Sequence, residues 1–259
     1  MEENCVKYDD RAQKINSLVC VGLDADMSQI PSRFLTAKYP QYEFNQWVID
    51  ETHECAAAYK PNIAFYEARG DAGIFELKMT VDYLRLNYPD IFLIADAKRA
   101  DIGNTNQGSV YFIFDWLGFD AVTLHPYLGL EALKPFLDRQ DKYSIILGRT
   151  SNPGATEFQD LVWKKIAQAV AGHSNKNLML VMGATYPQDL QKARALCGDM
   201  TFLIPGVGAQ GADVTECVSV GKNSLGRGLI INSSRAIIFS GHPKQEATQL
   251  RDVIRKQIK

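Results

Sequence analysis

The stretch LIADAKRADIGNT, residues 93–105, joins an apolar run directly to a dense group of charges. Its first three residues are apolar and predict a buried β-strand. Four charged side chains then follow within six positions: Asp96, Lys98, Arg99 and Asp101. A buried strand that ends in charges of both signs indicates a functional site at its carboxyl end.

Similar strand patterns recur along the chain and determine the predicted fold. Short apolar runs occupy 19–24, 57–62, 91–97, 120–125, 143–149, 177–183, 201–206 and 228–234. Helix-length segments lie between most of them, at 41–56, 71–87, 104–117, 156–171 and 187–196, with a shorter one at 129–137 and a polar one at 211–221. Apolar strands separated by helices are typical of parallel sheets covered on both faces. We therefore predict an α/β fold, a (β/α)8 TIM barrel, in preference to an open doubly wound sheet.

The length and composition fit one such barrel. The chain has 259 residues, and barrels of this kind commonly have about 250. No Pro/Gly/Ser-rich linker divides it, so we predict a single domain over residues 1–259.

Charge, cysteines and apolar runs indicate where the protein works. The net charge of −2 gives no polycation for nucleic acid, and no apolar run approaches the roughly 20 residues of a membrane span. The five cysteines form no C-x-x-C pair and suit a reducing compartment. The acidic N-terminus lacks the apolar core of a secretory signal. We expect a soluble cytoplasmic protein with no nucleic-acid or membrane partner.

Polar residues gather where the predicted strands end. In a TIM barrel the carboxyl ends of the strands and the loops after them build the active site. The residues found there are Asp24, Asp26, Lys60, Asn62, Asp96, Lys98, Asp101, Arg149, Thr150, Ser151, Gln210 and Arg235. Side chains two apart on a strand share a face, so Asp96 and Lys98 should point together into the mouth, where Lys60 can join them. One such pair could be a structural salt bridge, but the set Lys60, Asp96, Lys98 and Asp101 favours a functional array.

The last two strands carry a candidate phosphate site. IPGVGAQGAD (204–213) supplies backbone N–H groups and flexible glycines, and Arg235 offers two parallel hydrogen bonds. The loops after strands 7 and 8 commonly bind phosphate in this fold. A glycine-rich turn beside a surface arginine is the structural alternative.

Metal binding is the other chemistry that the acidic residues allow. Four aspartates could supply oxygen ligands to Mg²⁺: Asp24, Asp26, Asp96 and Asp101. Lys60 and Lys98 would compete for the same carboxylates, and the four histidines lack metal-ligand spacing. These residues therefore argue against a metal site.

Five motifs together resemble the orotidine 5′-phosphate decarboxylase family. DAKRADIGNT (96–105) is similar to its D-x-K-x-x-D-I-x-x-T signature, and GLDAD (22–26) to its first-strand aspartate motif. YKPN (59–62) resembles its second-strand lysine, RTSNPGA (149–155) its pyrimidine-side loop and IPGVGAQG (204–211) its phosphate-gripping loop. Ser234, which precedes Arg235, departs from the glycine of many relatives.

The resemblance implies conversion of orotidine 5′-monophosphate to uridine 5′-monophosphate and CO₂ in de novo pyrimidine synthesis, without a metal or an organic cofactor. By analogy, Asp96 faces the substrate carboxylate, Lys98 delivers a proton to C6, and Lys60 and Asp101 complete the array. The implied substrate-binding residues are Asp24, Asn62, Ile102, Thr105, Ser151, Pro205, Gln210, Ser234 and Arg235.

The resemblance also assigns parts of the substrate to these residues. Asp24 with Lys60 would address the ribose hydroxyls, Ser151 the pyrimidine amide, and Gln210 with Arg235 the phosphate. Asp101 and Thr105 would reach the ribose bound by the neighbouring subunit, which implies a homodimer.

Three other functions remain open. A sugar-phosphate decarboxylase or aldol-type synthase of the same superfamily would require Mg²⁺. A Schiff-base aldolase could use Lys60 or Lys98 as its nucleophile, although flanking carboxylates hold a lysine protonated. A non-catalytic protein that binds a phosphate ligand would have no need of the charged array.

Overall fold

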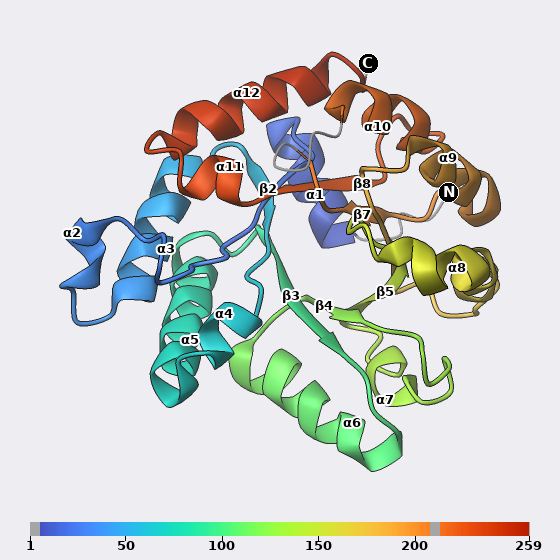
Figure 1. Cartoon of the computed structure of the whole chain (residues 1–259), viewed down its shortest axis with the longest axis horizontal. Coiled ribbons are helices and arrows are strands. Elements are labelled where there is room, and N and C mark those ends of the chain that lie inside the picture. The colour runs from blue at the N-terminus through green and yellow to red at the C-terminus, as the bar shows by residue number, and fades with distance from the viewer. Residues whose placement is uncertain (1–5, 208–212, 259) are drawn as a thin grey trace.

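The computed structural model describes residues 6–207 and 213–258, and its strands close into a barrel (Figure 1). They follow chain order around it: β1 (Val19–Val21), β2 (Ala56–Tyr59), β3 (Phe92–Arg99), β4 (Ala121–Leu124), β5 (Tyr143–Arg149), β6 (Leu178–Met182), β7 (Phe202–Ile204) and β8 (Leu229–Ser233). Every neighbouring pair is parallel, and β1 pairs with β8 to complete the circle. The predicted (β/α)8 barrel is confirmed.

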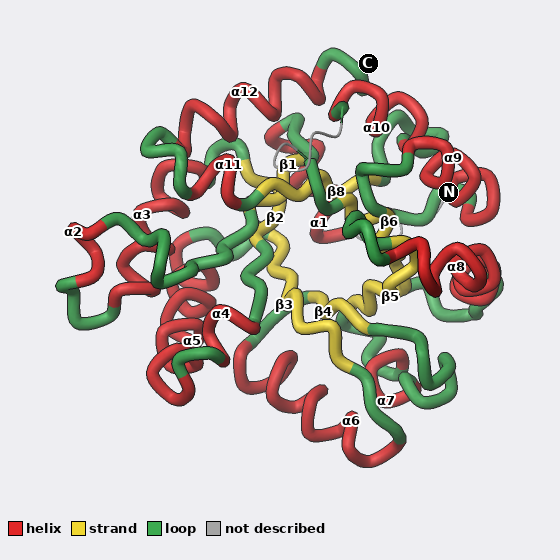
Figure 2. Tube along the Cα trace, in the orientation of Figure 1, coloured by secondary structure: helices red, strands yellow, loops and turns green. Residues whose placement is uncertain are grey.

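Helices form a ring around the strands (Figure 2). The longer ones are α1 (Val6–Ile15), α3 (Pro40–Thr52), α5 (Gly70–Asn87), α6 (Gly103–Val110), α8 (Ala155–Ala171), α9 (Pro187–Cys197), α10 (Val214–Gly221) and α12 (Pro243–Arg255). Single helical turns within the described residues are α2 (Ser32–Leu35), α4 (Ala64–Glu67), α7 (Lys134–Leu137) and α11 (Arg235–Ile238). Helices α3, α9 and α12 begin with proline, whose fixed φ suits the first helical position.

Helix α1 covers the amino end of the barrel. The Tyr8 hydroxyl donates to the carbonyl of Leu229, the first residue of β8, at 2.6 Å. The Ser17 hydroxyl, just after α1, donates to the carbonyl of Cys55 at 2.6 Å, immediately before β2. These contacts satisfy carbonyls at the strand starts and leave the opposite, carboxyl end as the face for a site.

Several element boundaries differ from the predicted ones. The segment 104–117 is not one α-helix, because α6 passes into a π-helix at Tyr111–Leu117 that buries Ile113, Phe114 and Leu117. The helix predicted at 129–137 is only the single turn α7, and the strand runs 19–24 and 57–62 end early, at Val21 and Tyr59.

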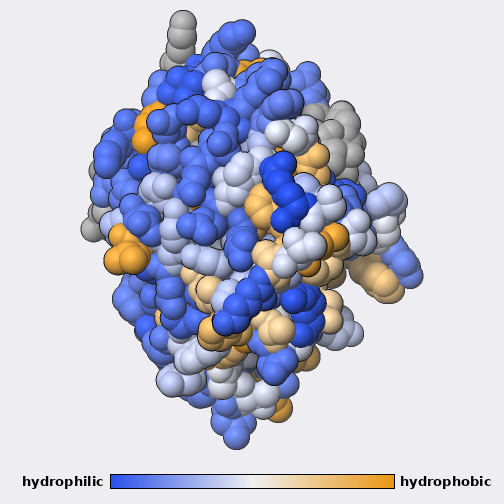
Figure 3. All heavy atoms as spheres, turned by 90° about the vertical axis from the view of Figure 1, so that its left-hand side faces the viewer, coloured by the Kyte–Doolittle hydropathy of each residue, from blue (hydrophilic) through white to orange (hydrophobic). Residues whose placement is uncertain are grey.

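The outer surface is mainly polar. On the face that carries α2 and α3, hydrophilic residues cover most of the area and hydrophobic ones gather toward its right-hand side (Figure 3). Within residues 6–207 and 213–258, no helix is long and apolar enough to cross a membrane.

Candidate active site

A cavity of about 510 Å³ lies at the carboxyl ends of the strands. Every strand, or the loop after it, contributes to the lining, which includes Asp24, Lys60, Asp96, Lys98, Thr123, Leu147, Ser151, Val181, Leu203, Pro205, Asn232, Ser234 and Arg235. A cavity of this volume accommodates a small organic ligand, and its mixture of apolar and convergent polar groups is typical of active sites. Of the polar residues predicted to gather at this end of the barrel, eight line the cavity: Asp24, Lys60, Asn62, Asp96, Lys98, Thr150, Ser151 and Arg235. Asp26, Asp101 and Arg149 do not.

Asp96 lies between two lysines in this cavity. Lys60 Nζ donates to Asp96 Oδ2 at 2.8 Å, and Lys98 Nζ donates to Asp96 Oδ1 at 2.7 Å. The Lys60 side chain is only 4% exposed and that of Asp96 12%, whereas Lys98 is 47% exposed. The lysines therefore differ: one is buried beside the carboxylate, and the other extends into the open cavity.

The paired charges keep the buried groups ionised. Burial alone would raise the pKa of Asp96, but the positive charges of Lys60 and Lys98 outweigh it and hold that pKa well below its usual range. Burial would lower the pKa of Lys60, but Asp96 and Asp24 outweigh it and raise that pKa above its ordinary value. A carboxylate and an ammonium are thus the stable forms at neutral pH.

Backbone hydrogen bonds fix the ends of β2 and β3 against each other. The Asp96 N–H donates to the Pro61 carbonyl at 3.0 Å, and the Ile63 N–H donates to the Asp96 carbonyl at 3.2 Å. The Asn62 N–H donates to the Asp24 carboxylate at 3.2 Å. These contacts bring Asp24, Lys60 and Asn62 to one side of the array.

Asp96 and Lys98 meet as predicted, but not through simple strand alternation. Ala95 pairs with Val122 and Arg99 with Leu124, so β3 advances four residues while β4 advances two. Lys98 has a φ of 45°, in a region that residues other than glycine rarely occupy. The two side chains therefore converge because β3 bulges between Ala95 and Arg99.

The opposite side of the cavity is formed after β7 and β8. Pro205, Ser234 and Arg235 line it, and Arg235 is exposed. Ser234 fits beside β1 only because residue 22 is glycine: a Cβ at Gly22 would lie 1.8 Å from Ser234 Oγ. The Ser234 side chain is thus accommodated because the residue directly after β1 has no side chain.

Ser151 also lines the cavity, on the loop after β5. A Cβ on Gly183, which follows β6, would lie 2.8 Å from the Ser151 nitrogen. Glycine at this position allows the Thr150–Ser151 backbone to approach the end of β6. Arg149, in contrast, does not line the cavity: its side chain is buried over the Tyr186 ring and pairs with Asp160 at 2.8 Å.

Three predicted site residues lie outside the cavity of the single chain. Asp101, Ile102 and Thr105 are exposed and do not line it. The Asp101 carboxylate accepts the N–H of Ile102 at 2.7 Å, and the Asp101 N–H donates to the Asn106 side chain at 2.9 Å. The expectation that these residues act on a neighbouring subunit's site stays a prediction. Gln210 lies outside the described residues.

Four polar lining residues were not predicted from the sequence: Thr123, Asn152, Gln159 and Asn232. Thr123 and Asn232 lie near the carboxyl ends of the apolar runs 120–125 and 228–234. A polar residue at such a position could have been recognised as facing the cavity. Asn152 lies within the loop motif RTSNPGA (149–155). Gln159 lies in helix α8, and nothing in its sequence context indicated the cavity.

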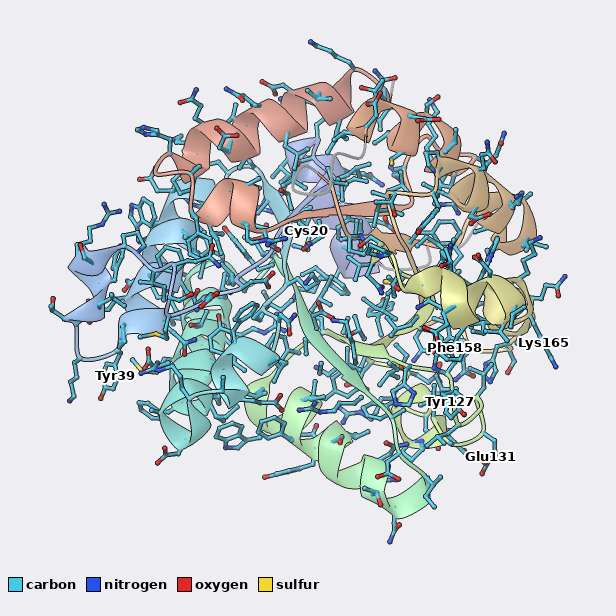
Figure 4. The ribbon with its side chains drawn as sticks, in the orientation of Figure 1. Cys20, Tyr39, Tyr127, Glu131, Phe158 and Lys165 are labelled. Carbon is cyan, nitrogen blue, oxygen red and sulfur yellow. The ribbon has the colours of Figure 1, made fainter. Side chains whose placement is uncertain are left out.

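Cys20 of β1 lies near the centre of the barrel (Figure 4). Burial raises the pKa of its thiol to about 12, although Lys60 opposes this shift. The Cys20 thiol therefore stays protonated and does not provide a nucleophile.

A closed parallel barrel with a charged cavity at the carboxyl ends of its strands defines the class, a TIM-barrel enzyme. Residues 17–250 match the model of the orotidine 5′-phosphate decarboxylase / HUMPS family, and the chain belongs to this family.

Individual relatives agree with the family match. The chain is 45% identical over 234 residues to orotidine 5′-phosphate decarboxylase of Christiangramia forsetii, covering 88% of this chain and 86% of the relative. It is 43% identical over 256 residues to the enzyme of the same name from Cellvibrio japonicus, covering 94% and 93%. The structure of Leishmania donovani OMP decarboxylase is similar with a TM-score of 0.88 and 32% identity, covering 99% of both chains. By family, the protein is a carbon–carbon lyase.

Proposed function

We propose that this protein converts orotidine 5′-monophosphate to uridine 5′-monophosphate and CO₂ in pyrimidine biosynthesis. The family match and the names of the curated relatives support this substrate. The observation that carries the proposal is the Lys60–Asp96–Lys98 array in the barrel mouth, in which Lys60 and Asp96 are buried and Lys98 extends into the cavity. The proposal needs neither a metal nor an organic cofactor.

The reaction requires groups that stabilise charge as it develops. When the bond from C6 to the carboxylate breaks, its electron pair stays on C6 and no adjacent carbonyl can accept it. Fixed ammonium groups in a confined cavity stabilise such charge without the reorganisation that water would require. Asp96 faces the substrate carboxylate and holds both lysines in place.

Lys98 donates the proton that completes the reaction. Its ammonium is more exposed than that of Lys60, so it is the better placed of the two to contact a bound ring. Transfer of one proton to C6 forms the C–H bond of the product and leaves a neutral amine, which regains a proton from water. Lys60 stays buried and charged.

The remaining residues bind the parts of the substrate that do not react. Asp24 and Asn62, beside Lys60, bind the ribose, and Ser151 binds the pyrimidine amide. Pro205, Gln210, Ser234 and Arg235 bind the phosphate. Arg235 follows β8 and Lys98 lies on β3, three strands away around the barrel, and this placement supports the assignment. Binding energy at the phosphate can contribute to catalysis at the distant ring.

The site is completed by a second copy of the chain in a homodimer. Asp101, Ile102 and Thr105 are exposed at the carboxyl end of β3 and available to a partner. Tyr127 and Phe158 lie on the side of the molecule that carries α7 and α8 (Figure 4). They are 91% and 68% exposed, and large hydrophobic side chains exposed in one subunit are typical of a surface that a second subunit covers.

The geometry disfavours two of the alternative functions. A Schiff-base aldolase needs a neutral lysine, but Asp96 and Asp24 raise the pKa of Lys60. A Mg²⁺ enzyme needs free carboxylate oxygens, but both oxygens of Asp96 accept hydrogen bonds from lysine. Among the described residues, no three His, Cys, Asp or Glu side chains are grouped as a metal site.

Incubation of the purified protein with orotidine 5′-monophosphate tests the proposal. We expect loss of the orotate absorbance together with formation of uridine 5′-monophosphate and CO₂. A sugar-phosphate substrate assayed in parallel with Mg²⁺ should not react. Tight binding of the nucleotide without turnover would instead favour the non-catalytic alternative.

A further inference from the structure

Thr123 of β4 lies opposite the bulge in β3 that carries Asp96 and Lys98. Two residue steps on β4, from Val122 to Leu124, match four on β3, and Thr123 is the single residue between them. Its side chain is buried and lines the cavity. A bulge interrupts the regular ladder, so the backbone groups within it need other partners.

The Thr123 hydroxyl makes two hydrogen bonds, and their directions are determined. The Lys98 backbone N–H lies 3.0 Å from Thr123 Oγ1, and an N–H can only donate. Thr123 Oγ1 lies 2.9 Å from Asp96 Oδ1, and the ionised Asp96 can only accept. The hydroxyl therefore accepts from the backbone of one member of the array and donates to the side chain of the other.

The same contacts explain how Lys98 keeps an unfavourable backbone conformation. A residue other than glycine at positive φ persists only when its surroundings hold it there. Of the described residues other than glycine, only Asn16 and Lys98 have positive φ, and Asn16 directly follows α1. At Lys98 the bond from its N–H to Thr123 is the side-chain contact that fixes the backbone.

We propose that Thr123 is a positioning residue: its hydroxyl fixes the backbone of Lys98 and the carboxylate of Asp96, so that the Lys98 ammonium is aimed at the reacting atom. Thr123 does not contact the reacting atoms itself. The inference rests on the proposed function for its kinetic consequence, but the geometry of the bulge does not depend on the substrate.

The test compares Thr123→Val, which removes the hydroxyl and keeps the branched shape, with Thr123→Ser, which keeps the hydroxyl. We expect Thr123→Val to lower kcat by about 10- to 100-fold with KM changed less than about threefold, because misplaced groups lose transition-state contacts rather than binding. Thr123→Ser should recover most of kcat. If Thr123→Val does not fold, Thr123→Ala removes the same hydroxyl.

Thr80→Val is the matched control. Thr80 is equally buried, and its hydroxyl donates to the Glu76 carbonyl, but it does not line the cavity. It should lower thermal stability while kcat is unchanged. Equal kcat in Thr123→Val and wild type, or a loss that Thr123→Ser does not relieve, would overturn the proposal.

Amide hydrogen exchange at Lys98 supplies a readout that needs no activity. We expect exchange at least about tenfold faster in Thr123→Val than in wild type or Thr123→Ser, because the N–H loses its partner. Unchanged exchange at Lys98 would contradict the proposal even if the enzyme acts on another substrate. Failure of wild type to turn over orotidine 5′-monophosphate would count against the proposed function alone.

Discussion

The two sides of the cavity differ in how their charged side chains are held. After β2 and on β3, Asp96 accepts hydrogen bonds from both Lys60 and Lys98, and its pKa is far below the usual range. After β8, Arg235 is exposed and forms no side-chain hydrogen bond or ion pair with any residue in 6–207 or 213–258. The charged groups at β2 and β3 are thus already hydrogen-bonded to one another, whereas the Arg235 guanidinium after β8 is available to bind a ligand.

This difference separates two tasks. Groups that stabilise a transition state work best when they are already oriented, because reorganisation then costs nothing during the reaction. A group that binds a remote anion needs only to be available and to form contacts as the ligand is bound. We therefore predict that substitutions in the β2 and β3 array affect kcat most, and that substitutions at Arg235 affect substrate binding as well.

The largest effect is expected from Lys98→Ala. The variant loses both the proposed proton donor and one of the two cations beside Asp96, so kcat should fall by at least about 10³-fold. Steady-state and single-turnover assays with orotidine 5′-monophosphate measure the loss. Activity within tenfold of wild type would remove Lys98 from its proposed role.

The second prediction concerns the exposed segment at Asp101. Asp101→Ala and Lys98→Ala proteins should each be nearly inactive, because each lacks one member of the proposed shared array. Mixing them under conditions of subunit exchange should restore up to about a quarter of wild-type activity, since half of the dimers are mixed and each has one intact site. No recovery despite demonstrated exchange would place all four charges in one subunit.

Arg235→Ala tests the proposed phosphate-binding side of the cavity. We expect kcat/KM to fall by about 100-fold, or nearly 3 kcal/mol, with part of the loss in kcat if phosphate binding contributes to closure of the site. Added guanidinium ion should restore some activity to Arg235→Ala but none to Lys98→Ala, because the group missing from Lys98→Ala is the proposed proton donor. Unchanged kinetics would weaken the phosphate assignment.

The smallest effect concerns the packing that supports the β8 side. Gly22→Ala should destabilise the fold by about 1–3 kcal/mol, because the new methyl group overlaps the Ser234 side chain. The double variant Gly22→Ala/Ser234→Gly should regain most of that stability in denaturant unfolding. Equal stability of the single and double variants would show that the two residues do not interact.

The sequence predicts the barrel and most of the cavity because both follow from strand patterns. Apolar runs locate the strands, and polar residues at the ends of several runs locate their contribution to the cavity, as for Asp24, Lys60 and Asp96, which line it. The bulge at Lys98 could not be predicted, because alternation assumes a regular strand. The contact between Gly22 and Ser234 joins residues far apart in the chain, and no local pattern encodes it.

The central claim is that the charged side chains of this protein, without a metal, carry out the decarboxylation. The most direct test is the rate of conversion of orotidine 5′-monophosphate by protein that has been treated with a strong chelator and assayed in its presence. We expect an undiminished rate, with uridine 5′-monophosphate and CO₂ formed in equal amounts. Loss of activity on chelation, with recovery on addition of Mg²⁺, would contradict it.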